Sequence, residues 1–172
     1  MSKSRYIAKF GILLALACTL QFLEGMIPLP LPLGVKAGFS SMVIMYLLLY
    51  MGFADAMTAA VLKSGFVFIT RGPSAFCMSV CGGILSVLAM ALIVKLSRRS
   101  EKGMGLIPLS VTGGIFHNLG QLAAAAVISG SLWTASYIPV LVIAGIISGI
   151  VTGTILGLIL PKTEKSAHER SV

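Results

Sequence analysis

Four polar side chains interrupt long apolar runs of this chain, and they are the residues best suited to bind a small molecule. Lys63 lies in one apolar run, and His117, Asn118 and Gln121 lie in another. A charged side chain in the middle of a membrane costs about 2.5–3.5 kcal/mol on insertion scales, so it normally faces a cavity or a partner. Spacings of three and four residues place the second group on one turn of a helix. These residues predict a polar cavity inside an apolar protein.

Both features also have purely structural explanations. In the first, Lys63 extends its ammonium group to the outer surface, because the helix that carries it is short. In the second, the polar turn at 117–121 only forms hydrogen bonds between helices. Three polar groups on one turn exceed what helix packing needs, since each must find a partner in a medium of low dielectric constant. We therefore favour a cavity in both cases.

The composition predicts an integral membrane protein made of helices. Hydrophobic residues make up 57% of the 172 residues, charged residues make up 10%, and the mean hydropathy is +1.01. Soluble chains normally carry about 25% charged residues, so we expect a single transmembrane domain over residues 1–172. The net charge of +8 is explained by attraction to an anionic inner leaflet, at about 1 kcal/mol per basic residue. We expect no nucleic-acid partner.

Basic residues gather in three polar stretches, and this distribution predicts the topology. Ten of the thirteen Lys and Arg residues lie near the N-terminus, in the segment 95–102 or in the tail after residue 161. Basic flanks mark the cytoplasmic side of a membrane protein, so we expect both termini and residues 97–105 in the cytoplasm of a bacterial cell. The protein would be a multi-pass protein of the cell membrane. The ten residues are Lys3, Arg5, Lys9, Lys95, Arg98, Arg99, Lys102, Lys162, Lys165 and Arg170.

Six apolar segments meet or approach the length of about 20 residues that a spanning helix needs. The expected spans are 7–27, 39–53, 56–69, 75–96, 106–128 and 137–160. The two short segments, the second and the third, alternatively merge into a re-entrant hairpin, which leaves four spans and the same sidedness. The first segment imitates a signal peptide that ends near Cys18. Apolar sequence continues beyond this cysteine, so we expect a retained helix.

The direction of the spans predicts a pocket that opens outwards. The first, third and fifth spans run from inside to outside, which carries their polar residues towards the same end. Lys36 and Arg71 lie in the expected outer loops and add positive charge to that of Lys63, while Glu24 is the one acid nearby. A cationic pocket suits a phosphorylated or carboxylated ligand.

Small residues at helical spacing predict close helix contacts on the first and the last span. On the last span, glycines at every fourth position form a ridge without side chains, which packs inside the monomer or against a partner. On the first span, a shorter stripe packs against this ridge or against a partner. The ridge consists of Gly145, Gly149, Gly153 and Gly157, and the stripe consists of Gly11, Ala15 and Cys18.

Two motifs resemble a known family. The run IPLPLPLGVKAG over residues 27–38 and the motif HNLGQ over residues 117–121 resemble the Gx transporter family, whose members are often labelled heptaprenyl diphosphate synthase component I. That family is similar to the S components of energy-coupling factor transporters, which bind the solute. The resemblance extends from the first span to the last, and it implies an S-component-like bundle.

The resemblance also implies roles for particular residues. Lys36 and the polar residues of the second motif would lie near the ligand, and Lys63 occupies a position where the family tends to place a basic residue. S components present small residues of their first helix to a coupling protein, so the stripe on the first span would bind that protein. Separate ATPase subunits would then supply the energy.

The label and the resemblance imply different functions. A prenyl diphosphate synthase uses clustered aspartates to hold Mg²⁺ on the diphosphate, but this chain has the single aspartate Asp55 and no G-x-x-x-x-G-K-[ST] motif for ATP. We therefore expect no enzyme activity, no cofactor and no metal. We expect a substrate-binding subunit that captures a small anionic, vitamin- or cofactor-like solute outside the cell. The alternatives are a non-catalytic membrane partner of a prenyl diphosphate synthase and a purely structural scaffold.

Overall fold

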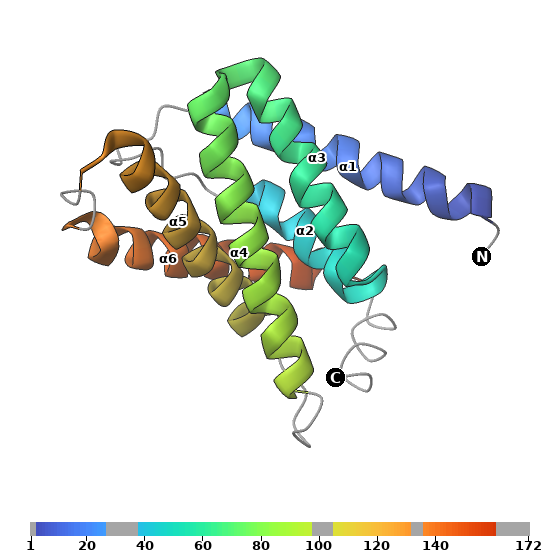
Figure 1. Ribbon diagram of the computed structural model, residues 1–172. Helices are drawn as coiled ribbons and strands as arrows, with labels where there is room; N and C mark the ends of the chain where they lie inside the picture. The colour runs from blue at the N-terminus through green and yellow to red at the C-terminus, as the bar shows by residue number, and fades with distance from the viewer. Residues whose placement is uncertain (1–2, 27–37, 98–104, 132–135, 161–172) are drawn as a thin grey trace.

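The computed structural model describes residues 3–26, 38–97, 105–131 and 136–160. These residues form a bundle of six helices (Figure 1), each of which lies within a few residues of a predicted span. Lys36 and the proline-rich run 28–32 lie outside the described residues, as do most of the expected cytoplasmic loop and the basic tail. The helices are α1 (Lys3–Met26), α2 (Phe39–Tyr50), α3 (Phe53–Arg71), α4 (Pro73–Ser97), α5 (Leu106–Ser129) and α6 (Ile138–Ile159).

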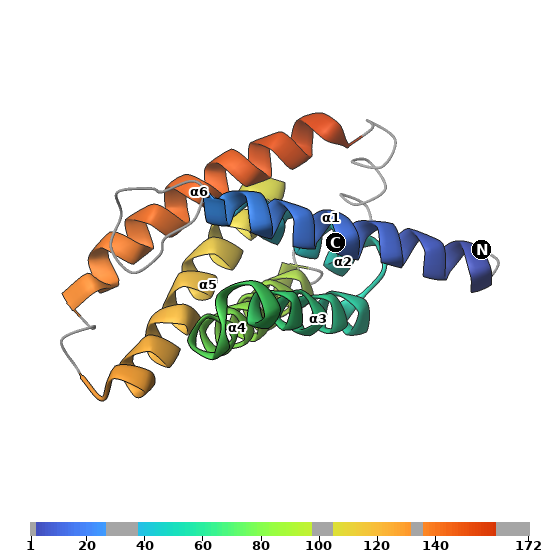
Figure 2. The ribbon, with the colours of Figure 1, turned by 90° about the horizontal axis from the view of Figure 1, so that it is seen from above.

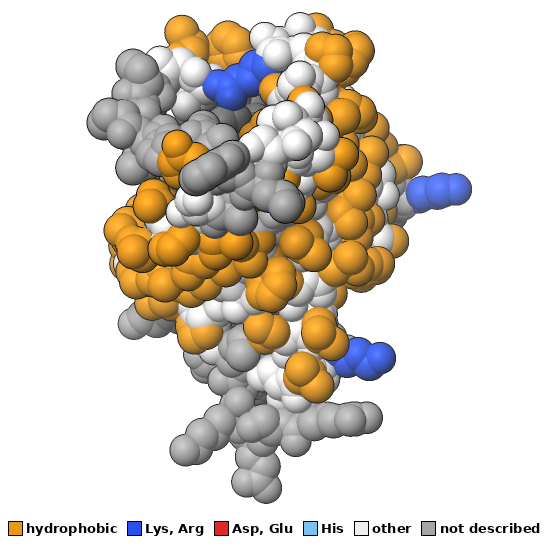
Figure 3. Space-filling view, turned by 60° about the vertical axis from the view of Figure 1, so that its left-hand side comes forward, with side chains coloured by type: hydrophobic (Ala, Val, Ile, Leu, Met, Phe, Trp, Pro, Cys, Tyr) orange, Lys and Arg blue, Asp and Glu red, His pale blue; other side chains and the backbone are white. Residues whose placement is uncertain are grey.

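Five of these helices are long and apolar enough to cross a membrane, and α2 is the exception. With 12 residues, α2 is about 18 Å long, which is shorter than a hydrocarbon core of about 30 Å. Hydrophobic side chains form a broad band across the middle of the face shown in Figure 3, and basic side chains on it are few and far apart. The prediction of a helical multi-pass membrane protein is confirmed. The crossing of α2 and the cytoplasmic position of the termini stay predictions.

Helices α3 to α6 pack as antiparallel neighbours. In each pair, residues in the second half of one helix meet residues in the first half of the other, and hydroxyl side chains join the two helices. Such interhelical hydrogen bonds are worth about 0.6 kcal/mol each in membrane proteins, so they fix the register more than they supply stability. The bonded pairs are Ser64 with Ser79 at 2.9 Å, Ser86 with the Gly113 carbonyl at 2.9 Å and Ser110 with Thr152 at 2.8 Å.

Helix α1 runs in the same direction as α3. The Tyr6 hydroxyl near the start of α1 donates a hydrogen bond to Asp55 in the first turn of α3. At the other end, the guanidinium of Arg71 lies directly against Gly25, where it fills the space that a Cβ atom would need. The chain alternates direction from α3 to α6, so α1, α3 and α5 point the same way, as the predicted topology requires. The N-terminal end of α1 projects beyond the other helices in Figures 1 and 2.

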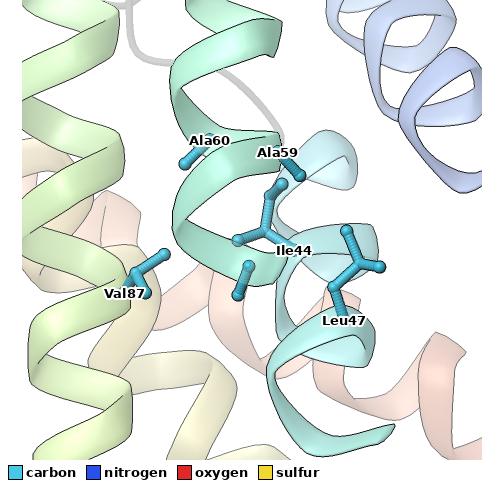
Figure 4. Packing of buried hydrophobic residues seen from close by; sticks show 6 residues of the cluster. Ile44, Leu47, Ala59, Ala60 and Val87 are labelled. Atoms are coloured by element: carbon cyan, nitrogen blue, oxygen red, sulfur yellow. The ribbon is translucent and has the colours of Figure 1, made fainter. Parts of the chain in front are cut away.

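The apolar core lies where α2, α3 and α4 meet (Figure 4). Ile44 and Leu47 of α2 pack against Ala56, Ala59 and Ala60 of α3, and Val87 of α4 completes the cluster. The alanines allow the neighbouring helices to approach α3 closely, and the branched side chains of α2 fill the remaining space. Helix α2 is thus held against α3 and α4 although it is short.

The glycine ridge of α6 packs against α5. A Cβ atom added at Gly145 would lie 2.8 Å from the Cα of Ile115, and one at Gly153 would lie 2.9 Å from the Cα of Ile107. A Cβ added at Gly149 would overlap the backbone of Val111, whereas at Gly157 its nearest neighbour is a side-chain atom at 3.9 Å. The ridge therefore faces another helix of the same chain. It is occupied by α5 and does not receive the stripe of α1.

We predict that Gly149→Ala lowers the unfolding temperature in detergent. The added methyl group meets backbone atoms, and overpacking of this kind costs about 1–3 kcal/mol, which exceeds the gain of up to about 1 kcal/mol in helix propensity. The matched control is Gly157→Ala, where the space is open and the unfolding temperature should be unchanged or higher. Equal unfolding temperatures for the two variants, measured by circular dichroism, would contradict the backbone contact.

Candidate functional site

The N-terminus of α2 lies inside the bundle, and buried side chains of α1 satisfy it. The chain enters α2 through Gly38, which has a left-handed φ of 79°. The backbone N–H of Ser40 donates to Glu24 Oε1 at 3.1 Å, and the Ser40 hydroxyl donates to Gln21 Oε1 at 2.7 Å. The first N–H groups of a helix have no partner within it, and negative charge is favourable there. Glu24 therefore stabilises the start of α2.

Lys63 joins α3 to the same group. Its side chain is only 2% exposed, and its ammonium donates to the Ser40 hydroxyl at 3.2 Å. Glu24, which is 6% exposed, attracts this ammonium electrostatically. A buried charge is tolerated when it is paired and hydrogen-bonded, and here Ser40 contacts both charged residues. The alternative in which Lys63 extends to the surface is wrong.

The polar residues of the α5 turn have two kinds of hydrogen-bond partner. His117 and Gln121 hydrogen-bond each other through their side-chain nitrogens at 3.2 Å. Asn118 donates instead to the backbone carbonyl of Leu141 in α6, at 2.9 Å. The interhelical explanation thus accounts for the amide of Asn118, whereas the bond between His117 and Gln121 lies within their own turn.

A small polar cavity lies between the start of α2 and the polar turn of α5. Its volume is about 20 Å³, enough for about one water molecule, so a larger ligand enters only if the helices around it move apart. Four helices contribute to its wall. The lining residues are Gln21 and Glu24 of α1, Ser40 and Ser41 of α2 with the preceding Gly38, Gly114, His117, Asn118 and Gln121 of α5, and Ser148 of α6.

The structure brings together some of the predicted site residues and separates others. Glu24 and the whole polar turn of α5 line the cavity, and Lys63 lies one hydrogen bond away from it through Ser40. Arg71 does not line the cavity: α3 continues through this residue, and the exposed side chain lies on α1 at Gly25. Lys36 falls outside the described residues. Of the three basic residues expected in the pocket, the described part of the chain therefore places only Lys63 beside it.

Gln21 and the serines of the cavity wall were not predicted from the sequence. Gln21 precedes Glu24 by three residues, a spacing that puts both on one face of α1, and this signal was available. Ser40 and Ser41 start α2, and Ser148 lies beside the glycine ridge. Serine is common at helix starts and at close helix contacts, so these three positions carried no distinct signal of a cavity.

These features define an integral membrane protein with a polar site enclosed by its helices. The chain belongs to the family described as heptaprenyl diphosphate synthase component I, whose family model matches residues 13–159. The matched range contains every lining residue of the cavity as well as Lys63. No curated protein and no solved structure matches the chain.

We predict that the two buried charges of the site depend on each other. Glu24→Gln leaves the ammonium of Lys63 without its opposite charge, and breaking a buried pair costs about 3–5 kcal/mol. Adding Lys63→Met to that variant removes the unmatched charge and should restore most of the thermal stability lost. The measurement is the unfolding temperature in detergent of Glu24→Gln, of Lys63→Met, of the double variant and of the parent protein.

The control for this comparison is Lys95→Met, which removes an exposed charge from α4 and should not restore the stability of Glu24→Gln. If the effects of Glu24→Gln and Lys63→Met on the free energy of unfolding are additive in the double variant, the two residues do not interact.

Proposed function

We propose that the chain is the solute-binding subunit of a membrane transporter, related to the S components of energy-coupling factor transporters. The polar cavity beside a buried charge is the observation that carries this proposal. Ionisable residues among membrane-spanning helices typically mark the path of a substrate. Transporters also bind their substrates where a helix begins inside the bundle, as α2 does here. The solute would enter from the outer side, and separate energy-coupling subunits would drive its uptake.

The proposed solute is small, vitamin- or cofactor-like, and carries a negative charge. Two features support the charge. The N-terminus of α2 faces the cavity through Ser40 and Ser41, and helix N-termini attract anions. The ammonium of Lys63 is one hydrogen bond further in. An anionic group that entered here would compete with Glu24 for the same donors, so binding would rearrange the hydrogen bonds of the site.

A transmembrane coupling protein and ATPase subunits complete the proposal. The stripe on α1 is open towards the surroundings. Ala15 is exposed, and a Cβ atom added at Gly11 would have no neighbour within 4 Å. Because α5 occupies the glycine ridge of α6, the partner that we propose for this stripe lies outside the described helices. Cys18, at the C-terminal end of the stripe, is half-buried.

The family description supports a second candidate function, that of a non-catalytic membrane partner of a prenyl diphosphate synthase. In this alternative, the synthase would supply the aspartates that hold Mg²⁺, because the chain itself has one aspartate. The family description does not distinguish this function from transport.

Ligand co-purification distinguishes the two functions. The protein is extracted in mild detergent, purified, and analysed by mass spectrometry for bound small molecules and bound proteins. A water-soluble anionic compound at a ratio near one per chain would support solute binding. A polyprenyl lipid or a bound synthase, with no soluble compound, would overturn the transporter proposal.

We predict that Gln121→Met weakens binding of the co-purified solute. The substitution keeps the length of the side chain but removes the amide that faces the cavity, and a ligand group left unpaired costs about 1–3 kcal/mol, roughly a 5- to 150-fold loss in affinity. Thr112→Val, at a partly exposed position of α5 that does not line the cavity, is the matched loss of a polar group and should leave the affinity unchanged. Equal affinities for both variants in a direct binding assay would remove the cavity as the solute site.

We predict that Ala15→Leu prevents assembly with the coupling protein while the isolated subunit keeps its stability and its solute affinity. The larger side chain separates two backbones that otherwise approach closely. Ala123→Leu makes the same change at an exposed position of α5 and should leave assembly and uptake intact. An Ala15→Leu protein that assembles and transports like the parent would show that this stripe is not the interface.

A further inference from the structure

An apolar groove lies between α1 and α6, away from the polar cavity, with α2 between the two helices. Its volume is about 300 Å³, at the lower end of the range for ligand sites. The base is buried at Val43 and Leu156, whereas the rims are open at Leu16, which is 45% exposed, and Ile159, which is 65% exposed. Its wall consists of Leu13, Leu16, Met42, Val43, Tyr46, Leu156, Ile159 and Leu160.

One end of the groove carries positive charge. Lys9 lies one turn before Leu13 on the same face of α1, and its ammonium is 5.2 Å from the centre of the Tyr46 ring. A cation over an aromatic ring is attracted to it, and this contact holds the ammonium at the end of the groove. Lys3 and Arg5 precede it in the same helix.

No described carboxylate neutralises this charge. The described part of the chain contains two carboxylates. Glu24 belongs to the polar cluster at the other end of α1, and Asp55 accepts the hydrogen bond of Tyr6 on the side that faces α3. The end of the groove at Lys9 is therefore complementary to an anion.

The shape and the charge of the groove match a lipid. The groove is apolar and open at its rims, and one end is cationic. An extended hydrocarbon chain follows such a channel without leaving polar backbone groups to satisfy, and an anionic headgroup matches the cationic end.

We infer that the groove holds an acyl chain of an anionic phospholipid whose phosphate binds Lys9. The chain gains little from leaving water, because it already lies in the bilayer, but it gains dispersion contacts on a concave wall. The headgroup supplies the selectivity, because a basic residue near the membrane surface attracts an anionic lipid. This site is independent of what the polar cavity binds.

Native mass spectrometry of the full chain in detergent tests the inference. Phosphatidylglycerol and phosphatidylcholine with identical acyl chains are added at equal concentration, and the bound fractions are compared. The parent protein should bind the first lipid more tightly. Lys9→Gln should reduce this preference about fivefold, the equivalent of about 1 kcal/mol, and Leu16→Trp, which fills the groove, should remove the tightly bound lipid.

Two controls on α4 match these changes. Lys95→Gln removes an exposed charge and Leu92→Trp enlarges an exposed side chain, and neither should alter lipid binding. The inference is overturned if the parent protein shows no preference, or if Lys9→Gln behaves like Lys95→Gln. It is equally overturned if Leu16→Trp leaves lipid binding unchanged and instead abolishes a complex with another membrane protein, because the groove would then receive a partner helix.

Discussion

The buried ammonium of Lys63 is the constraint on which the arrangement of the first three helices depends. A charged side chain that is only 2% exposed needs hydrogen bonds and a nearby opposite charge. Ser40 accepts the hydrogen bond of the ammonium, and Glu24, which also contacts Ser40, supplies the opposite charge. This serine lies at the start of α2, so the start of that helix is held at the depth of Lys63. The same N-terminus then requires an acceptor, which Glu24 provides from α1. One charge thus determines where a short helix begins and which face of α1 turns inwards.

The sequence predicted the helices and their directions well, because both follow from local signals. Apolar length marks a helix that can cross a membrane, and a regular glycine repeat marks a surface that another helix can approach. The site was predicted only in part. Lys63 and His117 stand out because polar residues are rare in apolar runs, whereas Ser40 and Ser148 resemble ordinary helix starts and packing positions. Arg71 was misplaced because α3 continues two residues beyond the predicted end at residue 69 and so includes Arg71, whose side chain lies on α1.

Helix α1 lines the polar cavity with one part of its surface and the apolar groove with another. Gln21 and Glu24 turn one part of the helix towards the buried site, while Leu13 and Leu16 turn another part towards the groove. Gly11 and Ala15 face neither. A single helix therefore lines the polar cavity, lines the apolar groove and keeps an open surface. Because the groove side and the side of Gly11 and Ala15 are not covered by other described helices, α1 is the least buried of the candidate spans.

The glycine contacts of α5 have a mechanical consequence for the whole bundle. Gly120 meets the backbone of α4, and Gly145 and Gly153 meet the backbone of α5, so α4, α5 and α6 are in direct main-chain contact and resist separation. Helix α1 contacts mainly α2 and α3, through side chains and the hydrogen bonds of Ser40. The cavity lies on the boundary between these two units, so it can widen by a displacement of α1 and α2 that leaves these three glycine contacts intact. Helices α4, α5 and α6 would keep their contacts during such a displacement, whereas Ser40, through its bonds to Glu24 of α1 and Lys63 of α3, would make α2 move together with those two helices.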